Sequence, residues 1–410
     1  NPQSPIPKFI LYKGIYYNII FYINIFFHFF IYPKMDYSKI SPWNCGDFPV
    51  KVNNIRFNQD NTLLTLATSR GYKIFSAKTL RKVQEETELV RNLGDLKIVM
   101  TYYESSIVFI TGKKNNKEIT QKQFIIFDDF SQKIIYKFES RNENIINFYI
   151  SKNAIFIALE NNIVIIELFS LKIINIIEKV EINNKLVSFN SNNIISYLIQ
   201  NKPKRIYIND YIFKNNILSE ITTKYIDCPF DWVQCINLSQ SGNYIAIVSI
   251  LGNKIHIYQT SNCSLIKCIL IGIKIFNIEK VSFIYNKTKE NYFAVNINNN
   301  RINIYKINHK ENKDISCLCD NYLDDDVLNG KKKANQNNYF LNYLWPQKND
   351  DITEYHLNII SKNNIIFSEF FIFSFNKSFV IIDKEGFYHI YFFNKEKAEI
   401  PNAYGVCKWI

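Results

Sequence analysis

The 410-residue sequence lacks the short motifs that mark the common enzyme classes. It contains no GxxxxGKS or GxxxxGKT phosphate loop, no HExxH zinc motif, no GxSxG nucleophile turn and no glycine-rich dinucleotide turn. Its five histidines stand at no spacing from a cysteine or carboxylate that suggests a catalytic or metal site. We therefore expect no enzymatic activity, no metal and no organic cofactor.

Paired cysteines of the zinc-binding kind are also missing. The eight cysteines include no CxxC pair, and only Cys317 and Cys319 lie close together in the sequence. Idle or buried thiols are therefore expected rather than a disulfide framework. The sequence after residue 34 is typical of a cytosolic protein.

Stretches with the 3.6-residue period of an amphipathic helix are almost absent as well. What recurs instead is a two-strand unit: a polar turn, an alternating apolar run, a Gly or Asn break and a second alternating run. Alternation with period two places one face of each strand in a core, and Gly or Asn at the break supplies the positive φ of a tight hairpin. Copies of this unit lie at residues 61–79, 152–170, 241–260, 289–307 and 376–394.

Many short strands at this spacing favour a β-sandwich, a barrel or a propeller. A sandwich seldom needs a chain this long, whereas seven four-stranded blades need roughly 300 residues and leave room for one long loop. We therefore predict an all-β fold, a seven-bladed β-propeller over residues 35–410 with a loop insertion at about 309–353. The strand at residues 50–57 is expected to pair with the last blade, near residues 364–395, and so to close the ring.

The predicted insertion differs from the repeated units in its charge pattern. Residues 320–338 hold an acidic block followed by a basic block without apolar periodicity, which predicts a mobile loop. The aromatic residues at 339–345 also suit a water–lipid boundary. A solvated tether and a membrane-facing or partner-facing role therefore both stay open.

The first 34 residues form an apolar N-terminal extension. The run from Ile15 to Tyr32 is long enough to test as a membrane span, yet it carries polar residues and is followed by the first methionine, Met35. Three interpretations stay open: translated non-coding sequence upstream of a start at Met35, a signal or anchor segment, and a folded element.

The formal net charge of +12 favours acidic partners such as anionic lipid or nucleic acid. The lysines are dispersed and form no dense basic arm, so a solvated basic surface is the simpler interpretation. We do not expect nucleic acid as a partner.

Three stretches together carry a resemblance to a known family. Residues 56–75 centre on Phe-Asn-Gln-Asp, residues 124–166 include the Asp128-Asp129 pair, and residues 235–276 form a gap-free block of strands. In order and spacing they resemble the first, the second to third, and the fifth blades of the PROPPIN or WIPI proteins, the phosphoinositide-binding β-propellers of autophagy. The resemblance covers most of residues 50–395.

This resemblance implies a WD-repeat-like propeller that acts as a monomeric scaffold. Such a protein is cytoplasmic and binds peripherally to pre-autophagosomal or endosomal-type membranes that carry phosphatidylinositol 3-phosphate. In the most similar subgroup the first-blade loop helps to bind a large lipid-transfer protein of autophagy, and the corresponding residues here are Asn58, Gln59 and Asp60. Because Asn and Asp in a tight turn often cap their own backbone, a purely local role for them stays open.

The family's lipid site is degenerate in this sequence. Its two-arginine signature falls on Ile269, Leu270, Ile271 and Gly272, so both arginines are missing. Its other positions retain a serine and a glycine and place a histidine at a basic position. The candidate lipid-binding residues are therefore Ser249, Gly252, Asn253, His256, Gly272, Lys274 and Arg301.

The missing arginines matter because a guanidinium donates two charge-assisted hydrogen bonds to one phosphate, whereas an aliphatic side chain supplies neither charge nor donor. Lys254, Lys267 and Lys274 provide point charges for a weaker electrostatic site. Two functions therefore stay open. One is a scaffold that recruits partners to membranes carrying phosphatidylinositol 3-phosphate, and the other is a protein-interaction propeller that no longer binds lipid specifically.

Overall fold

The structure is a computed structural model. It describes residues 51–77, 82–83, 90, 92–182, 185–200, 202–228, 230, 232–271, 275–286, 289–297 and 301–307, and the strands at 355–358, 370–373, 378–382, 387–392 and 406–408. The N-terminal extension and the predicted insertion lie outside the described residues.

The regular elements of the described chain are β-strands that pair in chain order into antiparallel sheets. The first sheet is made of β1 (Val52–Phe57), β2 (Leu63–Thr68) and β3 (Tyr72–Ser76). The next are β4 (Leu96–Thr101), β5 (Ile107–Gly112), β6 (Gln123–Asp128) and β7 (Lys133–Glu139); β8 (Asn147–Ile150), β9 (Ala154–Ala158), β10 (Ile163–Glu167) and β11 (Ile173–Ile177); and β12 (Val187–Phe189), β13 (Ile194–Ile199), β14 (Lys202–Lys214) and β15 (Ile217–Asp227).

The remaining sheets follow the same order. They are made of β16 (Val233–Leu238), β17 (Tyr244–Ser249), β18 (Lys254–Gln259) and β19 (Leu265–Leu270); β20 (Ile278–Asn286), β21 (Lys289–Ile297), β22 (Arg301–Lys306) and β23 (Tyr355–Asn358); and β24 (Phe370–Phe373), β25 (Ser378–Ile382), β26 (Phe387–Phe392) and β27 (Val406–Lys408).

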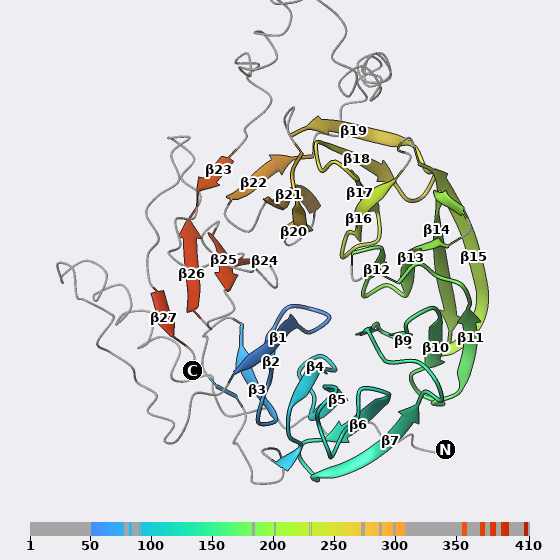
Figure 1. The fold of residues 1–410 in the computed structure, drawn as a ribbon, viewed down its shortest axis with the longest axis vertical. Coiled ribbons are helices and arrows are strands. Elements are labelled where there is room, and N and C mark those ends of the chain that lie inside the picture. The colour runs from blue at the N-terminus through green and yellow to red at the C-terminus, as the bar shows by residue number, and fades with distance from the viewer. Residues whose placement is uncertain are drawn as a thin grey trace, which may run out of the picture.

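These sheets stand around a ring, as Figure 1 shows from the blue first sheet to the red last sheet. In the sheets β4–β7, β16–β19 and β24–β27 the first strand lies nearest the centre and the last strand at the rim. This arrangement is a β-propeller, so the predicted all-β propeller is confirmed.

The repeated unit of the sequence is the middle hairpin of a sheet. The five copies coincide with the strand pairs β2–β3, β9–β10, β17–β18, β21–β22 and β25–β26. The expected positive φ occurs at two of the breaks, at Gly71 (74°) and Gly252 (65°). The turn between β9 and β10 closes without it, through a hydrogen bond from the Leu159 N–H to the Asn162 carbonyl.

The middle strands are buried on both faces rather than on one. Every residue of β2, β9 and β10 is buried. A neighbouring sheet packs against each face of β9 and β10, so all of their side chains except Glu167 are small or apolar. By contrast, no residue of the rim strand β7 is buried.

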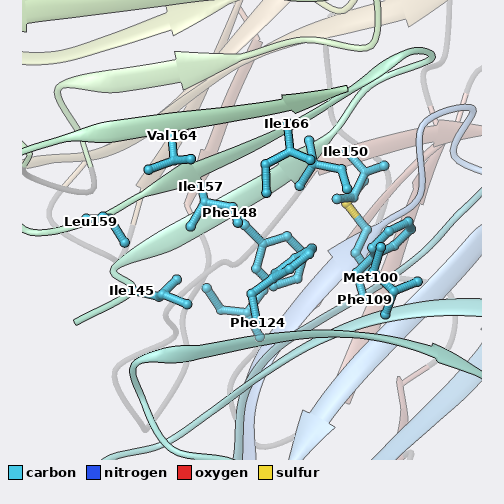
Figure 2. Packing of buried hydrophobic residues seen from close by; sticks show 13 residues of the cluster. Met100, Phe109, Phe124, Ile145, Phe148, Ile150, Ile157, Leu159, Val164 and Ile166 are labelled. Atoms are coloured by element: carbon cyan, nitrogen blue, oxygen red, sulfur yellow. The ribbon is translucent and has the colours of Figure 1, made fainter. Parts of the chain in front are cut away.

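Aromatic rings fill the space between adjacent sheets. In the cluster between β4–β7 and β8–β11, the Phe109 and Phe124 rings stack at 6.0 Å, and Phe124 meets the Phe148 ring edge to face at 5.1 Å (Figure 2). All three side chains are fully buried. Offset and edge-to-face ring pairs of this kind add to the stability gained from apolar burial.

The predicted pairing of the first strand with the last blade is wrong. The strand at residues 50–57, observed as β1, pairs with β2 in the first sheet, and the last sheet is completed at the rim by its own strand β27. A five-residue turn separates β1 from β2, so this local pairing costs far less loop-closure entropy than a pairing across most of the chain.

Replacing Phe148 with alanine should lower the free energy of unfolding by about 3–5 kcal/mol, because the change leaves a cavity between two sheets. Urea unfolding followed by tryptophan fluorescence measures the effect. Phe130→Ala is the matched control, since the Phe130 side chain is 75% exposed in the turn between β6 and β7. Equal effects of the two variants would contradict the packing described for the cluster.

Candidate functional site

The sheet β16–β19 contains four of the seven candidate lipid-binding residues, and three of these lie at the end where β17 turns into β18. We call this the one-turn end of the sheet, and the opposite end, with the β16–β17 and β18–β19 turns, the two-turn end. Ser249 closes β17, Gly252 and Asn253 lie in the turn, and Lys254 opens β18. The structure therefore brings three candidates, Ser249, Gly252 and Asn253, together in one turn.

The polar groups of this turn bond to one another. The Ser249 hydroxyl donates to the Asn253 side-chain oxygen at 2.8 Å and accepts the Lys254 backbone N–H at 3.2 Å. The Gly252 N–H donates to the Ser249 carbonyl at 2.8 Å. Ser249 is itself buried, so its hydroxyl holds the turn in shape.

Glycine is required at position 252 because the chain segment after β19 passes close to the β17–β18 turn. Its φ is 65°, and a Cβ added there would lie 2.0 Å from the Phe276 carbonyl oxygen. The Phe276 N–H donates to the Leu251 carbonyl at 2.9 Å. The chain after β19 is thereby tied against the β17–β18 turn.

His256 lies away from that turn surface. It is buried in the middle of β18, between its cross-strand neighbours Ile247 and Cys268. Its ring centroid lies 4.6 Å from that of Phe230. The family resemblance made His256 a candidate for lipid binding, but the structure places this side chain in the packed layer between sheets.

The positions that carry arginines in the family have different environments here. Ile269 is buried, Leu270 is half exposed at the end of β19, and the Ile271 N–H donates to the Asn253 carbonyl at 2.8 Å. Gly272 and Lys274 lie outside the described residues. Arg301 opens β22 opposite Ile297, and its side chain also lies outside the described part of the chain.

A pocket that the sequence did not single out lies at the start of β14. It has a volume of about 480 Å³ and is lined by Lys202, Lys204, Arg205 and Asp227. The Arg205 Nε donates to the Asp227 Oδ1 at 2.9 Å, and the guanidinium lies 4.2 Å from the Tyr225 ring centroid. The signal in the sequence is the Lys-Pro-Lys-Arg run, which stands out only once the adjacent strand β15 is placed beside it.

The candidate partner-binding residues lie in the turn between β1 and β2. Asn58 is buried, and its side-chain oxygen accepts the Leu63 N–H at 3.1 Å while its side-chain nitrogen donates to the Thr62 hydroxyl at 2.9 Å. Gln59 is also buried, and its side-chain oxygen accepts the Tyr103 N–H at 2.7 Å. Asp60 is exposed.

Asp60 caps the same turn and faces the neighbouring sheet. Its carboxylate accepts hydrogen bonds from the Thr62 backbone and hydroxyl, at 3.2 and 2.7 Å. Burial raises the pKa of the Tyr103 phenol, and the negative charge of Asp60 raises it further. Of the three candidate residues, Asp60 is therefore the one whose side chain reaches the surface.

Hydrogen bonds join the turns of several sheets into what we call the collar. The Gln240 side-chain nitrogen donates to the Gln59 carbonyl at 2.8 Å, and the Tyr102 hydroxyl donates to the Lys152 carbonyl at 3.1 Å. The Lys152 N–H donates to the Ser191 carbonyl at 3.2 Å, and the Ser191 hydroxyl donates to the Gln240 carbonyl at 3.2 Å. The collar thus connects the first-to-second-strand turns of the sheets from β1–β3 to β16–β19.

Among the described residues, no group of three or more His, Cys, Asp or Glu side chains is placed to hold a metal ion. In the described part of the chain, no helix is long and apolar enough to cross a membrane. No model of a known protein family matches the sequence.

Comparison with curated proteins gives relatives of one kind. Autophagy-related protein 18 of Kluyveromyces marxianus is 23% identical over 175 residues, which are 42% of this chain and 33% of that protein. SVP1-like protein 2 of Saccharomyces cerevisiae is 25% identical over 334 residues, or 73% of this chain and 70% of that protein. The match thus spans a third of the length of the first relative and over two thirds of the second.

Solved structures of Hsv2 and Atg21 resemble the chain in fold. Hsv2 of Kluyveromyces lactis superposes with a TM-score of 0.64 at 13% identity, covering 87% of this chain and 99% of that one. A complex of KlAtg21 with the coiled coil of AgAtg16 gives a TM-score of 0.58 at 14% identity, with coverage of 87% and 100%. The chain is a homologue of the PROPPIN propellers. The resemblance found in the sequence is therefore confirmed.

Within this PROPPIN-like propeller, Gln59→Ala should lower the free energy of unfolding by about 1 kcal/mol, because the half-buried Tyr103 N–H loses its acceptor. Urea unfolding provides the measurement. Gln259→Ala is the matched control, since Gln259 is exposed at the end of β18. If the Gln59 variant kept full stability, the collar would not depend on this side chain.

Proposed function

We propose that this chain is a non-catalytic scaffold of autophagy or a related membrane pathway that recruits protein partners to membranes carrying phosphatidylinositol 3-phosphate. The observation that carries the proposal is the homology to autophagy-related protein 18 and SVP1-like protein 2, joined to the propeller fold. In a propeller of this kind the turns at the strand ends meet lipid and partners, while the strands provide a rigid frame.

The propeller of this proposal has seven blades over residues 35–410. The sheet order supports this number, with one sheet per blade from β1–β3 to β24–β27. Lys82 forms an isolated bridge with Phe75 of β3, which supports a fourth strand of the first blade at this position. The pairing of β22 with β23 supports the insertion at 309–353 as a loop between two neighbouring strands of one blade.

The lipid contact in this proposal is weak and electrostatic. The arginine positions hold Ile269, Leu270 and Ile271, and the Ser249 hydroxyl is engaged within its own turn. Lysines then supply the attraction to anionic lipid, each as a point charge without the two-pronged geometry of a guanidinium. Lysine charges near a membrane surface act through the surface potential and discriminate little among headgroups of equal charge.

A protein-interaction propeller that no longer binds lipid specifically is the second candidate function. The burial of Asn58 and Gln59 within the collar favours it, because a first-blade loop held by its neighbours presents Asp60 in a fixed position. A protein partner of autophagy is further supported by the KlAtg21 structure, which is a complex with a coiled coil.

Vesicle flotation tests the lipid contact. We expect binding to anionic vesicles at low salt that falls steeply by physiological salt, where the Debye length shrinks from about 30 to 8 Å. Vesicles with phosphatidylinositol 3-phosphate and vesicles matched in charge with phosphatidylserine should bind alike. Tight, selective and salt-resistant binding of the phosphoinositide would show instead that other side chains have replaced the arginines.

Leu270→Arg should raise binding to all anionic vesicles at low salt about fivefold, since one cation near the surface contributes about 1 kcal/mol. Selectivity for phosphatidylinositol 3-phosphate should stay low because the Ser249 hydroxyl bonds to Asn253. Ile217→Arg is the matched control, with a 66% exposed side chain where β14 turns into β15. An equal gain in both variants would show that the position of the charge does not matter.

A further inference from the structure

The sheet β16–β19 is polar at one end and apolar at the other. Its two-turn end holds residues 239–243, Ser-Gln-Ser-Gly-Asn, and residues 260–264, Thr-Ser-Asn-Cys-Ser. Its one-turn end begins the β17–β18 turn with Ile250 and Leu251 and includes, after β19, the described residues Ile271, Ile275, Phe276 and Ile278. The two ends of one sheet thus present different chemistry.

Four large apolar side chains at the one-turn end are exposed, and we call them the apolar end. Their exposed fractions are 59% for Trp232, 50% for Ile250, 50% for Leu270 and 74% for Ile275. The other large exposed apolar residues of the described chain are spread over the rim strands and turns of other sheets. Clustered apolar exposure on a folded chain marks a surface that contacts something.

Hydrogen bonds hold the segments that carry these side chains next to one another. The Ile250 N–H donates to the Trp232 carbonyl at 3.0 Å, which ties the β17–β18 turn to the entry of β16. The Gln234 side chain accepts the Ile278 N–H at 2.9 Å and donates to the Phe276 carbonyl at 3.3 Å, which ties the segment carrying Ile275 to β16. Leu270 lies at the margin, opposite Lys254 across β18 and β19.

Lysines outnumber carboxylates in the sequence around the apolar end. From Trp232 to Ile278 the sequence holds Lys254, Lys267 and Lys274 and no aspartate or glutamate, and Asp231 and Glu279 border this span. Apolar side chains that include a tryptophan, in a sequence richer in lysine than in carboxylate, match the boundary between the acyl chains and headgroups of an anionic bilayer. A protein partner of this basic propeller would need carboxylates for the lysines, whereas the bilayer supplies phosphates and an apolar layer together.

We propose that the apolar end enters the interfacial layer of an anionic bilayer, with Trp232, Ile250 and Ile275 among the acyl chains and Lys254 at the headgroups. This inference rests on the membrane association of the proposed function and adds the contact that holds the chain there. Leu270 occupies a position where the family has an arginine, so apolar insertion replaces part of the binding that the arginine would give to the lipid headgroup. Because insertion depends on buried apolar area, it supplies the smaller part of the binding that remains after salt has screened the lysines.

Flotation with vesicles of phosphatidylcholine and phosphatidylserine, free of phosphoinositide, tests the contact. The double variant Trp232→Ser, Ile275→Ser should lower the partition coefficient at least about tenfold at physiological salt, because two large apolar side chains no longer enter the bilayer. The matched control is Phe130→Ser, Ile217→Ser, which makes the same kind of change at side chains exposed by 75% and 66% on other sheets. Circular dichroism checks that each variant keeps its fold.

Quenching by brominated lipid provides a second readout. Wild-type protein should lose more fluorescence on brominated vesicles than the variant Trp232→Phe, because the indole of Trp232 reaches the acyl chains. The other three tryptophans of the sequence are common to both proteins and cancel in the difference. Equal quenching of the two proteins would overturn the insertion of Trp232.

The remaining outcomes also decide the inference. It is overturned if the apolar-end double variant partitions like wild type, if the control double variant loses as much, or if wild type binds no anionic vesicle. It is also overturned if the apolar end pairs two copies of the chain, seen as a dimer in sedimentation that only the apolar-end variant abolishes. If phosphatidylinositol 3-phosphate and protein partners prove irrelevant while the Trp232 effects persist, the proposed function fails and the inference stands.

Discussion

The constraint on which the structure depends is the burial of each sheet's middle strands on both faces. A strand such as β9 or β10, whose residues are all buried, is stable only when a neighbouring sheet covers each side. The rings of Phe109, Phe124 and Phe148 meet this requirement between two of the sheets. Because the middle hairpins whose burial is described make the same demand, the sheets follow one another around a ring, and the turns at the strand ends remain at the surface.

The two ends of the strands differ in the contacts that their side chains make. At the two-turn ends, side chains such as Gln59 and Gln240 bond from sheet to sheet and form the collar, which fixes the centre of the propeller. At the one-turn end of β16–β19, the hydrogen bonds of Ser249 and Gln234 stay within the sheet and its following connection, and large apolar side chains are exposed. A rigid polar surface favours a protein partner of fixed shape, whereas an exposed apolar edge among lysines favours a bilayer, which adapts its shape.

The sequence predicted what depends on neighbouring residues and missed what depends on distant ones. The hairpins and the positive φ of Gly252 follow from local patterns, since a turn is closed by its own few residues. The bond between Gln240 and Gln59 joins residues 181 positions apart, so no local pattern reveals it. His256 shows a second limit: alternation says that a side chain leaves one face of a strand, but not whether a neighbouring sheet covers that face. Exposure of Trp232 is equally invisible in a chain whose residues are 47% hydrophobic.

Loss of the arginines changes where specificity resides in the proposed function. A guanidinium that grips one phosphate distinguishes headgroups, whereas apolar insertion and lysine charges respond only to area and charge density. A chain that relies on apolar insertion and lysine charges binds many anionic membranes with similar free energy. A partner bound to the same propeller then adds its own free energy only on the membrane where that partner resides. In this propeller Asp60 and Trp232 belong to one ring of sheets, so the proposed lipid and partner contacts would reinforce each other without any conformational change.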